Sequence, residues 1–181
     1  MRGFAPKRLK GQGDQATAVM GPAYLEHVLE RVLKAYFINL SKDDERRMFD
    51  GASNGVLGSF SSKIRLAYAI SLLGPLSYSD LLLINDIRNV FAHSLHRVSF
   101  SHPLIIKDCD RLQYFKMTME RVLGSYTPHR KSLDLFSDTI LAIHLGFLRL
   151  LMQTIPTKNE LLNRRVSQTT LDDMIWQLPS P

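Results

Sequence analysis

Apolar residues recur at three- and four-residue steps along most of the chain, which is the period of an amphipathic α-helix. The pattern is clearest in the first third, at Leu25, Val28, Leu29, Val32, Leu33, Tyr36 and Phe37. The same period predicts five main helices, at residues 24–40, 59–73, 77–91, 108–123 and 133–152. No series of alternating strands accompanies them, so we expect an all-α protein.

Polar residues mark where several of these helices begin. Pro22 suits the first turn of the first helix, because proline lacks the N–H that a first turn leaves unpaired. Ser41 and Asp44 have the spacing of a capping box and predict a further short helix after residue 41. Ser77 and Asp80 repeat that spacing, so the third main helix is expected to start there.

Turn-forming residues separate the helices. Gly74 and Pro75 form a terminator pair after the second main helix, and Pro156 is expected to end the last one. Residues 95–103 alternate between apolar and polar side chains as far as Pro103, which predicts a short irregular or extended segment. The result is about six helices around one core, which is a single-domain helical bundle.

The chain length of 181 residues and the hydrophobic content of 45% suit one domain with a buried core. We divide the chain into a basic flexible arm at 1–18, a helical domain at 19–155 and a C-terminal tail at 156–181. The tail carries large apolar residues around Trp176, which are costly to leave in water, so we expect a short helix that docks on the domain. The arm owes its charge to Arg2, Lys7, Arg8 and Lys10.

Charge and cysteine content bear on partners and location. Lys and Arg total 23 against 17 Asp and Glu, a net charge of +6 that permits contact with phosphate-rich partners. Within the domain, Lys63 and Arg65 are expected to be solvated rather than part of a phosphate-binding face. The one cysteine, Cys109, excludes an internal disulfide framework and fits a reducing compartment, so we expect a cytoplasmic protein.

The most apolar stretch, residues 133–155, has the overall composition of a membrane span. Asp134, Asp138, His144 and Arg149 interrupt it, and a bilayer would penalise ionisable groups at those intervals. We therefore expect a buried helix and no association with a membrane.

The motifs of the common nucleotide and metal enzymes are missing from the sequence. It has no GxxxxGKS/T phosphate loop, no GxGxxG after a strand, no HExxH, no GxSxG and no paired cysteines. His93, His96 and His102 lie close together but lack the spacing of zinc ligands on a helix. No segment has the turn and groove-reading helix of a helix-turn-helix. We therefore expect no metal and no cofactor.

Residues with catalytic potential gather at the end of the predicted helix at 77–91, where the sequence reads Ile-Arg-Asn-Val-Phe-Ala-His-Ser from residue 87. Asn89 and His93 are four residues apart, so they share a helix face, and we expect His93 to be partly exposed and close to Asn89. Arg88 can hold a phosphate, Asn89 can orient it, and the imidazole of His93 can move a proton. These are the parts of a metal-free ribonuclease that uses the 2′-hydroxyl of its RNA as the nucleophile.

The same residues also have a structural interpretation. Arg88 can pair with Asp80 or Asp86, and Asn89 can cap the backbone. His93 can end its helix, where a cation interacts favourably with the helix dipole. The two interpretations differ in whether Arg88 and His93 converge on an exposed surface or are used by partners within the chain.

The segment resembles the RNxxxH form of the HEPN family, small helical proteins many of which are ribonucleases. The match consists of Arg88, Asn89 and His93. The resemblance implies a catalytic site at the end of a helix, facing its own copy across a dimer. Arg97 and His102 repeat the Arg-to-His spacing farther along the chain.

A broader resemblance covers residues 56–112. It is carried by residues 57–70, Asp80-Leu, Ile87-Arg88-Asn89, Phe91-Ala-His93-Ser and Phe100, which together resemble the mannitol operon repressor (MltR) family. That family is all-helical and is named for repressing a sugar-alcohol operon without a recognised helix-turn-helix. The resemblance therefore implies a helical regulator.

Two functions of different classes follow from the sequence. The first is an MltR-like regulator, a repressor-like protein or interaction module that acts through a protein partner or as a homodimer, with nucleic acid bound through its basic surface. The alternative is a HEPN-type metal-independent ribonuclease that uses Arg88, Asn89 and His93. The larger matched span favours the regulator and the intact RNxxxH motif favours the ribonuclease, so enzymatic activity stays open.

Overall fold

The computed structural model describes residues 13–37, 39–52, 54–127 and 131–167, with side chains as far as Met152. Most of the basic arm and the Trp176 segment of the tail lie outside these residues. The described residues form seven α-helices and no strand, which confirms the prediction of a single all-α domain. The helices are α1 (Asp14–Tyr36), α2 (Lys42–Phe49), α3 (Phe60–Ala69), α4 (Pro75–His93), α5 (Pro103–Asp110), α6 (Tyr114–Leu123) and α7 (Ser132–Ser167).

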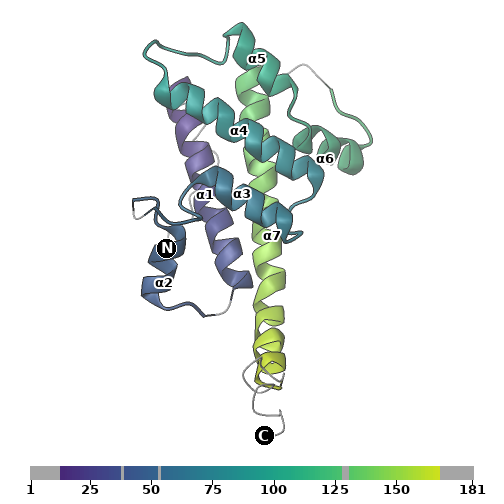
Figure 1. Ribbon diagram of the computed structural model, residues 1–181. Helices are drawn as coiled ribbons and strands as arrows, with labels where there is room; N and C mark the ends of the chain where they lie inside the picture. Colours follow the sequence, from purple (N-terminus) through teal and green to yellow (C-terminus); the bar gives the residue numbers. More distant parts are fainter. Residues whose placement is uncertain (1–12, 38, 53, 128–130, 168–181) are drawn as a thin grey trace, which may run out of the picture.

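Two long helices form the centre of the fold. α1 and α7 lie side by side and run in the same direction, α3 and α4 cross one side of α1, and α5 and α6 pack on the first part of α7 (Figure 1). Their apolar stripes meet in one core, and burying this surface is the main source of stability. The most deeply buried side chains include Leu25, Leu29, Ile64, Leu81, Ile84, Phe136 and Ile143.

α1 starts earlier than the apolar periodicity predicted. It begins at Asp14 rather than at residue 24, so residues 14–18, which we assigned to the basic arm, are helical. It also ends at Tyr36, short of the predicted end at residue 40. The early turns carry small and polar residues that give no periodic signal, yet Thr17 and Ala18 are fully buried by the helices around them. Tertiary packing therefore extends this helix beyond its sequence signal.

Pro22 lies inside α1 and not in its first turn as predicted. It follows Gly21, and both residues are buried. A Cβ atom at Gly21 would lie 2.8 Å from Cδ1 of Ile140, so the absence of a side chain lets α7 approach α1 closely. This contact holds the two long helices together at a point where proline removes one backbone hydrogen bond.

A buried carboxylate explains why one predicted helix is two. The periodicity predicted a continuous helix at 108–123, but α5 ends at Asp110 and α6 begins at Tyr114. Asp80 of α4, 1% exposed, accepts hydrogen bonds from the backbone N–H of Gln113, at 2.9 and 3.1 Å, and of Tyr114, at 2.7 Å. Asp80 therefore caps the start of α6 from a different helix.

The capping box predicted from Ser77 and Asp80 is wrong for the same reason. α4 begins at Pro75, directly after Gly74, and the Ser77 hydroxyl donates to the carbonyl of Gly74 at 3.1 Å. Burial raises the pKa of Asp80, and the hydrogen bonds from the two backbone N–H groups of α6 reduce that rise without cancelling it. The cap predicted at Ser41 is confirmed, because its hydroxyl accepts from the N–H of Asp44 at 3.1 Å.

Lys63 is not solvated, contrary to the prediction. Its side chain, on α3, is 4% exposed, and its ammonium contacts the carboxylates of Glu26 and Glu30 on α1, each at 2.9 Å. Glu30 also pairs with Lys34 at 2.8 Å, and Lys34 reaches Glu45 of α2 at 3.3 Å. Burial raises the pKa of Glu30, but the hydrogen bonds and charges of Lys34 and Lys63 outweigh it, so the pKa lies below 4.5. The network ties α2 and α3 to α1.

The last helix was predicted to end at Pro156, but α7 continues through this proline to Ser167. The stretch at residues 132–152 is long and apolar enough to cross a membrane by length and composition alone. One side of it is nevertheless in the core, where Phe136 and Ile143 are almost completely buried. This agrees with the predicted buried helix.

Candidate functional site

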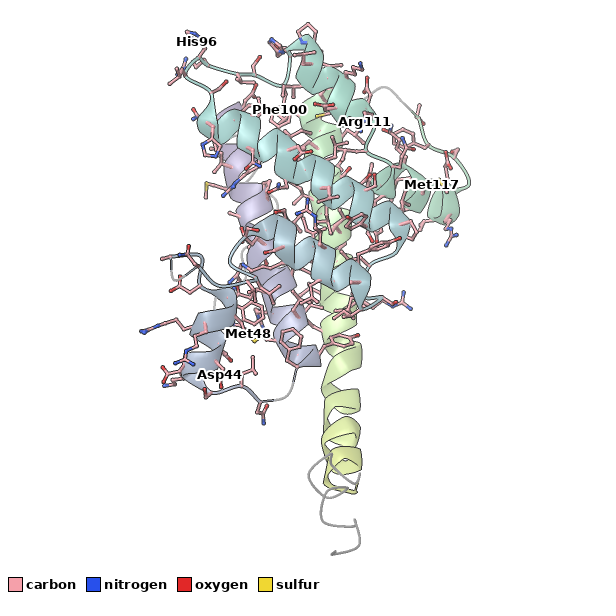
Figure 2. The ribbon with its side chains drawn as sticks, in the orientation of Figure 1. Asp44, Met48, His96, Phe100, Arg111 and Met117 are labelled. Atoms are coloured by element: carbon pink, nitrogen blue, oxygen red, sulfur yellow. The ribbon has the colours of Figure 1, made fainter. Side chains whose placement is uncertain are left out.

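The candidate site lies at one end of the molecule, where four elements meet. The last turns of α4, the loop at residues 94–102, the start of α5 and the start of α1 come together there (Figure 1). In Figure 2, His96 marks the outer part of this loop and Phe100 the point where the loop returns to the fold. We call these four elements the loop end of the molecule. The loop contains no strand, in line with the irregular segment predicted at 95–103.

The loop is fixed to the core through Phe100. This side chain is 4% exposed, and its ring packs against Phe91 of α4 at 4.9 Å and Phe136 of α7 at 5.1 Å between ring centroids. The backbone N–H of Phe100 donates to the Asp14 carboxylate at 2.9 Å. That bond joins the first residue of α1 to the loop. Sequence reasoning missed it, because no local signal links two residues so far apart in the chain.

Arg88 and Asn89 are half-buried on α4 and bonded to each other. The guanidinium Nη1 of Arg88 donates to Oδ1 of Asn89 at 3.0 Å. Among the ion pairs of the described residues, none joins Arg88 to Asp80 or Asp86, and Asp80 is used by the start of α6. Arg88 is therefore bonded to Asn89 and not to Asp80 or Asp86, the partners that the structural interpretation expected. The guanidinium is thus bonded to the residue that lies one turn before His93 on the same helix.

His93 occupies the last turn of α4 and is exposed, as predicted. It lies one turn beyond Asn89, so the imidazole is placed on the same helix face. At this position it also lies near the negative end of the helix dipole, where a positive charge is stabilised. The three residues of the RNxxxH motif therefore combine a guanidinium, an amide and an accessible imidazole within the last two turns of one helix.

The second Arg-to-His pair is arranged differently. Arg97 and His102 are both exposed, Arg97 on the loop and His102 at its end. His102 is the N-cap of α5, and its Nδ1 accepts from the backbone N–H of Leu104 at 3.4 Å. This gives His102 a structural role. The described residues include no group of three His, Cys, Asp or Glu side chains placed to hold a metal ion.

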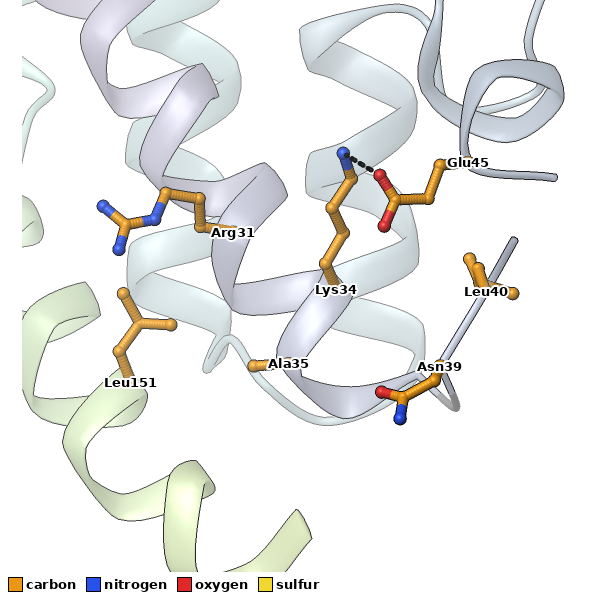
Figure 3. Close-up of a pocket in the computed structure, with 7 residues that line it drawn as sticks. All are labelled: Arg31, Lys34, Ala35, Asn39, Leu40, Glu45 and Leu151. Carbon is orange, nitrogen blue, oxygen red and sulfur yellow. Dashed lines mark hydrogen bonds and ion pairs between the residues drawn. The ribbon is translucent and has the colours of Figure 1, made fainter. Parts of the chain in front are cut away.

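Two cavities lined by described residues lie away from the loop end. One, of about 490 Å³, is lined by parts of α1, α2, the connection between them and α7 (Figure 3). Its charged residues include Lys34, which is paired with Glu45 inside the cavity wall and with Glu30 beside it. Another, of about 480 Å³, is a mainly apolar groove between the start of α4 and α7. Neither contains a residue of the RNxxxH motif.

Of two further groups that could react, Cys109 is buried and His144 is half-buried. Burial raises the pKa of the Cys109 thiol to about 12, with the charges of Asp108 and Asp110 adding to the rise, so this cysteine is not a nucleophile at neutral pH. His144 lies against α1, with its Nε2 3.4 Å from the hydroxyl of Tyr24. Burial lowers the pKa of His144, which keeps its imidazole neutral and makes it part of the α1–α7 contact.

Comparison with known proteins adds a likeness of fold. No family model matches the chain, and no curated protein matches it. A solved structure that it resembles is the crystal structure of a possible transcriptional regulator, YggD, from Shigella flexneri 2a strain 2457T. The match covers 84% of this chain and 99% of that one, with a TM-score of 0.52 and 10% sequence identity. The two chains therefore share an arrangement of helices.

Proposed function

We propose that this protein is a transcriptional regulator of helical architecture that acts without a helix-turn-helix. The observation that supports the proposal best is the likeness of fold to YggD, which extends over 99% of that chain. The resemblance of residues 56–112 to the mannitol operon repressor family points to the same class of function. The proposal extends the likeness of fold to a likeness of role.

The regulator acts, in this proposal, in the cytoplasm and through a protein partner or a second copy of itself. Leu145 and Met152 of α7 are 57% and 69% exposed, and exposed apolar side chains on one helix are typical of surfaces that a partner covers. The buried thiol of Cys109 needs no oxidising compartment.

Transcript measurements in the native host test the regulatory role. Strains that lack the gene are compared with strains that carry the wild type or His93→Ala. A regulator changes the synthesis of a defined set of transcripts, and His93→Ala restores normal levels as well as the wild type does. RNA half-lives, measured after transcription is blocked, stay the same in all strains. Unchanged transcripts in the deletion strain would refute the proposal.

A metal-independent ribonuclease is the second candidate, and one observation favours it. The Arg88 guanidinium is bonded to Asn89 at 3.0 Å, while His93 stands exposed one turn farther along the same helix. A guanidinium and an amide can hold a scissile phosphate, and an imidazole can act as general base or acid. This combination needs no metal, because the 2′-hydroxyl of the RNA is the nucleophile.

Incubation of the purified protein with mixed RNA in EDTA tests this candidate. EDTA removes the metal that metal-dependent nucleases need, so only a metal-free activity survives, and the comparison with His93→Ala assigns that activity to this protein. The ribonuclease candidate predicts cleavage by the wild type and by His96→Ala, an exposed loop variant that serves as the control, and none by His93→Ala. All three proteins should unfold at similar temperatures, since an exposed helix-end residue contributes at most about 1 kcal/mol. Equal inactivity of wild type and variants would remove the ribonuclease from consideration.

A further inference from the structure

α7 has a second apolar face that the core does not cover. Its core side carries four almost completely buried side chains, which are Phe136, Ile140, Ile143 and Phe147. Leu145, Leu148 and Met152 of the same helix are 57%, 37% and 69% exposed. At about 100° per residue, these three side chains lie roughly 140° around the helix from the core side. They therefore form an apolar stripe that faces away from the domain.

The stripe has the seven-residue repeat of a coiled coil. It starts at the half-buried Leu141 and proceeds by alternating steps of four and three residues. α7 stays helical as far as Ser167, and the sequence keeps the same steps to that end. The eight positions are Leu141, Leu145, Leu148, Met152, Ile155, Asn159, Leu162 and Val166. Seven of the eight are apolar, over nearly four repeats, which is typical of a helix that pairs with another helix.

The second half of α7 also extends beyond the other helices. In Figure 1 it runs past the ends of the helices that surround its first half. α7 contains 36 residues in all. Most of the stability of a helix in a protein comes from packing against other elements, so a partner helix along the stripe would stabilise this extension.

We propose that α7 forms a parallel two-stranded coiled coil with α7 of a second copy of this chain, along the stripe from Leu141 to Val166. A helix with this repeat fits another helix with the same repeat, and a second copy supplies one of identical length and register. A single Asn among the apolar positions, as at Asn159, favours a two-stranded, in-register pair, because the two amides can donate to and accept from each other. The inference rests on the proposed function only in that it names the partner which that function leaves open.

The residues beside the stripe are compatible with a parallel pair. In such a pair, a residue on one flank faces the residue five positions later on the other flank of the second copy. Lys158 would face Asn163 of the partner subunit, and Arg149 would face His144, which burial keeps neutral. No Lys or Arg is thus placed opposite another. Pro156 lies beside the stripe and not on it, so it removes one backbone hydrogen bond without interrupting the apolar contact.

Analytical ultracentrifugation of the full chain at about 1 to 50 µM tests the proposal. We expect a dimer of the 20.6 kDa chain at the upper end of this range. Leu145→Glu with Met152→Glu should weaken association at least about 100-fold, because each apolar side chain lost from the stripe accounts for about tenfold or more in affinity. The matched control is Val122→Glu with Leu123→Glu on α6, where the side chains are 69% and 68% exposed and lie off the stripe. All four substituted side chains are exposed, and thermal unfolding checks that both variants stay folded.

A cysteine cross-link tests the parallel arrangement. In a parallel, in-register pair each residue of the stripe meets its own copy, within reach of a disulfide bond. Oxidation should therefore link the dimer of Met152→Cys covalently, and leave the control Val122→Cys unlinked. The native Cys109 is buried and does not compete. Asn159→Ile should make association about tenfold tighter, because it removes a polar group from the contact.

Several results would overturn the proposal. A chain that is monomeric at 50 µM would leave the stripe to a different protein. Equal weakening by the stripe variant and the α6 control, a dimer of Met152→Cys that fails to cross-link, or an unchanged affinity of Asn159→Ile would each contradict the coiled coil. The transcript measurements give a separate answer: a dimer with unchanged transcripts would refute only the proposed function, and a monomer with altered transcripts only the coiled coil.

Discussion

Replacing Asp80 by alanine removes the cap that α4 supplies to α6. The carboxylate accepts from two backbone N–H groups at 2.7 to 3.1 Å, and a hydrogen bond to a charged group contributes roughly 1.5–3 kcal/mol. The net loss is smaller than the sum of these hydrogen-bond energies for two reasons. Burial of the carboxylate is itself costly, as the raised pKa of Asp80 indicates, and Gln113 is exposed, so its N–H can bond to water in the variant. We expect Asp80→Ala to lower the free energy of unfolding by about 2–3 kcal/mol.

Thermal unfolding followed by circular dichroism measures this change. A loss of that size lowers the melting temperature of a protein of this length by roughly 5–10 °C. Asp86→Ala is the matched control, because Asp86 is an exposed carboxylate on the same helix, and it should change stability by no more than about 0.5 kcal/mol. Hydrogen exchange at the amides of Gln113 and Tyr114 should become faster in Asp80→Ala only. Equal stability of the two variants would refute the assignment of Asp80 as a cap.

The pH dependence gives an independent check on Asp80. Its pKa in the folded protein is raised above the ordinary value of 3.8, so as the pH falls the folded state binds this proton before the unfolded state does. Titration of Asp80 therefore adds stability as the pH falls through the range just above 3.8, and this contribution is lost as the pH rises again. Asp80→Asn cannot titrate. As the pH falls through that range, the free energy of unfolding of the wild type should therefore rise relative to that of Asp80→Asn.

Two other buried contacts lead to further predictions. In urea titrations at pH 7, Lys63→Met should lower the free energy of unfolding by about 2 kcal/mol. The control Arg65→Met, at an exposed position of the same helix, should leave it almost unchanged. The pKa of Glu30 is lowered below 4.5 in the folded state, so its contribution to stability is present above that pH and is lost as the pH falls below it. The difference in stability between wild type and Lys63→Met should therefore shrink in acid. A difference that stays constant with pH would contradict the pairing of Lys63 with Glu30. Gly58→Ala should lower the free energy of unfolding by about 1–3 kcal/mol, because the added Cβ would lie 2.6 Å from the Cα of Gly51. Gly74→Ala is the control, because an added Cβ there meets open space, and it should lower the free energy of unfolding by less than about 1 kcal/mol in the same urea titration.

The apolar period and the local caps determined the class of fold from the sequence alone. Five of the seven helices, namely α1, α2, α3, α4 and α7, each overlap one predicted helix. Ser41 caps α2, as its spacing from Asp44 indicated. These signals are local, since a helix face and an N-cap involve residues three or four positions apart. The exposed position of His93 one turn after Asn89 was predictable for the same reason.

Contacts between distant parts of the chain decided the rest. The break between α5 and α6 depends on Asp80, more than 30 residues away, and the burial of Lys63 depends on two glutamates of α1. The start of α1 and the loop end depend on the bond between Asp14 and Phe100. The sequence shows that each of these side chains is polar, but not which partner it meets. A buried polar group needs a partner wherever the fold supplies one, and only the packing of the helices brings those partners within hydrogen-bond distance.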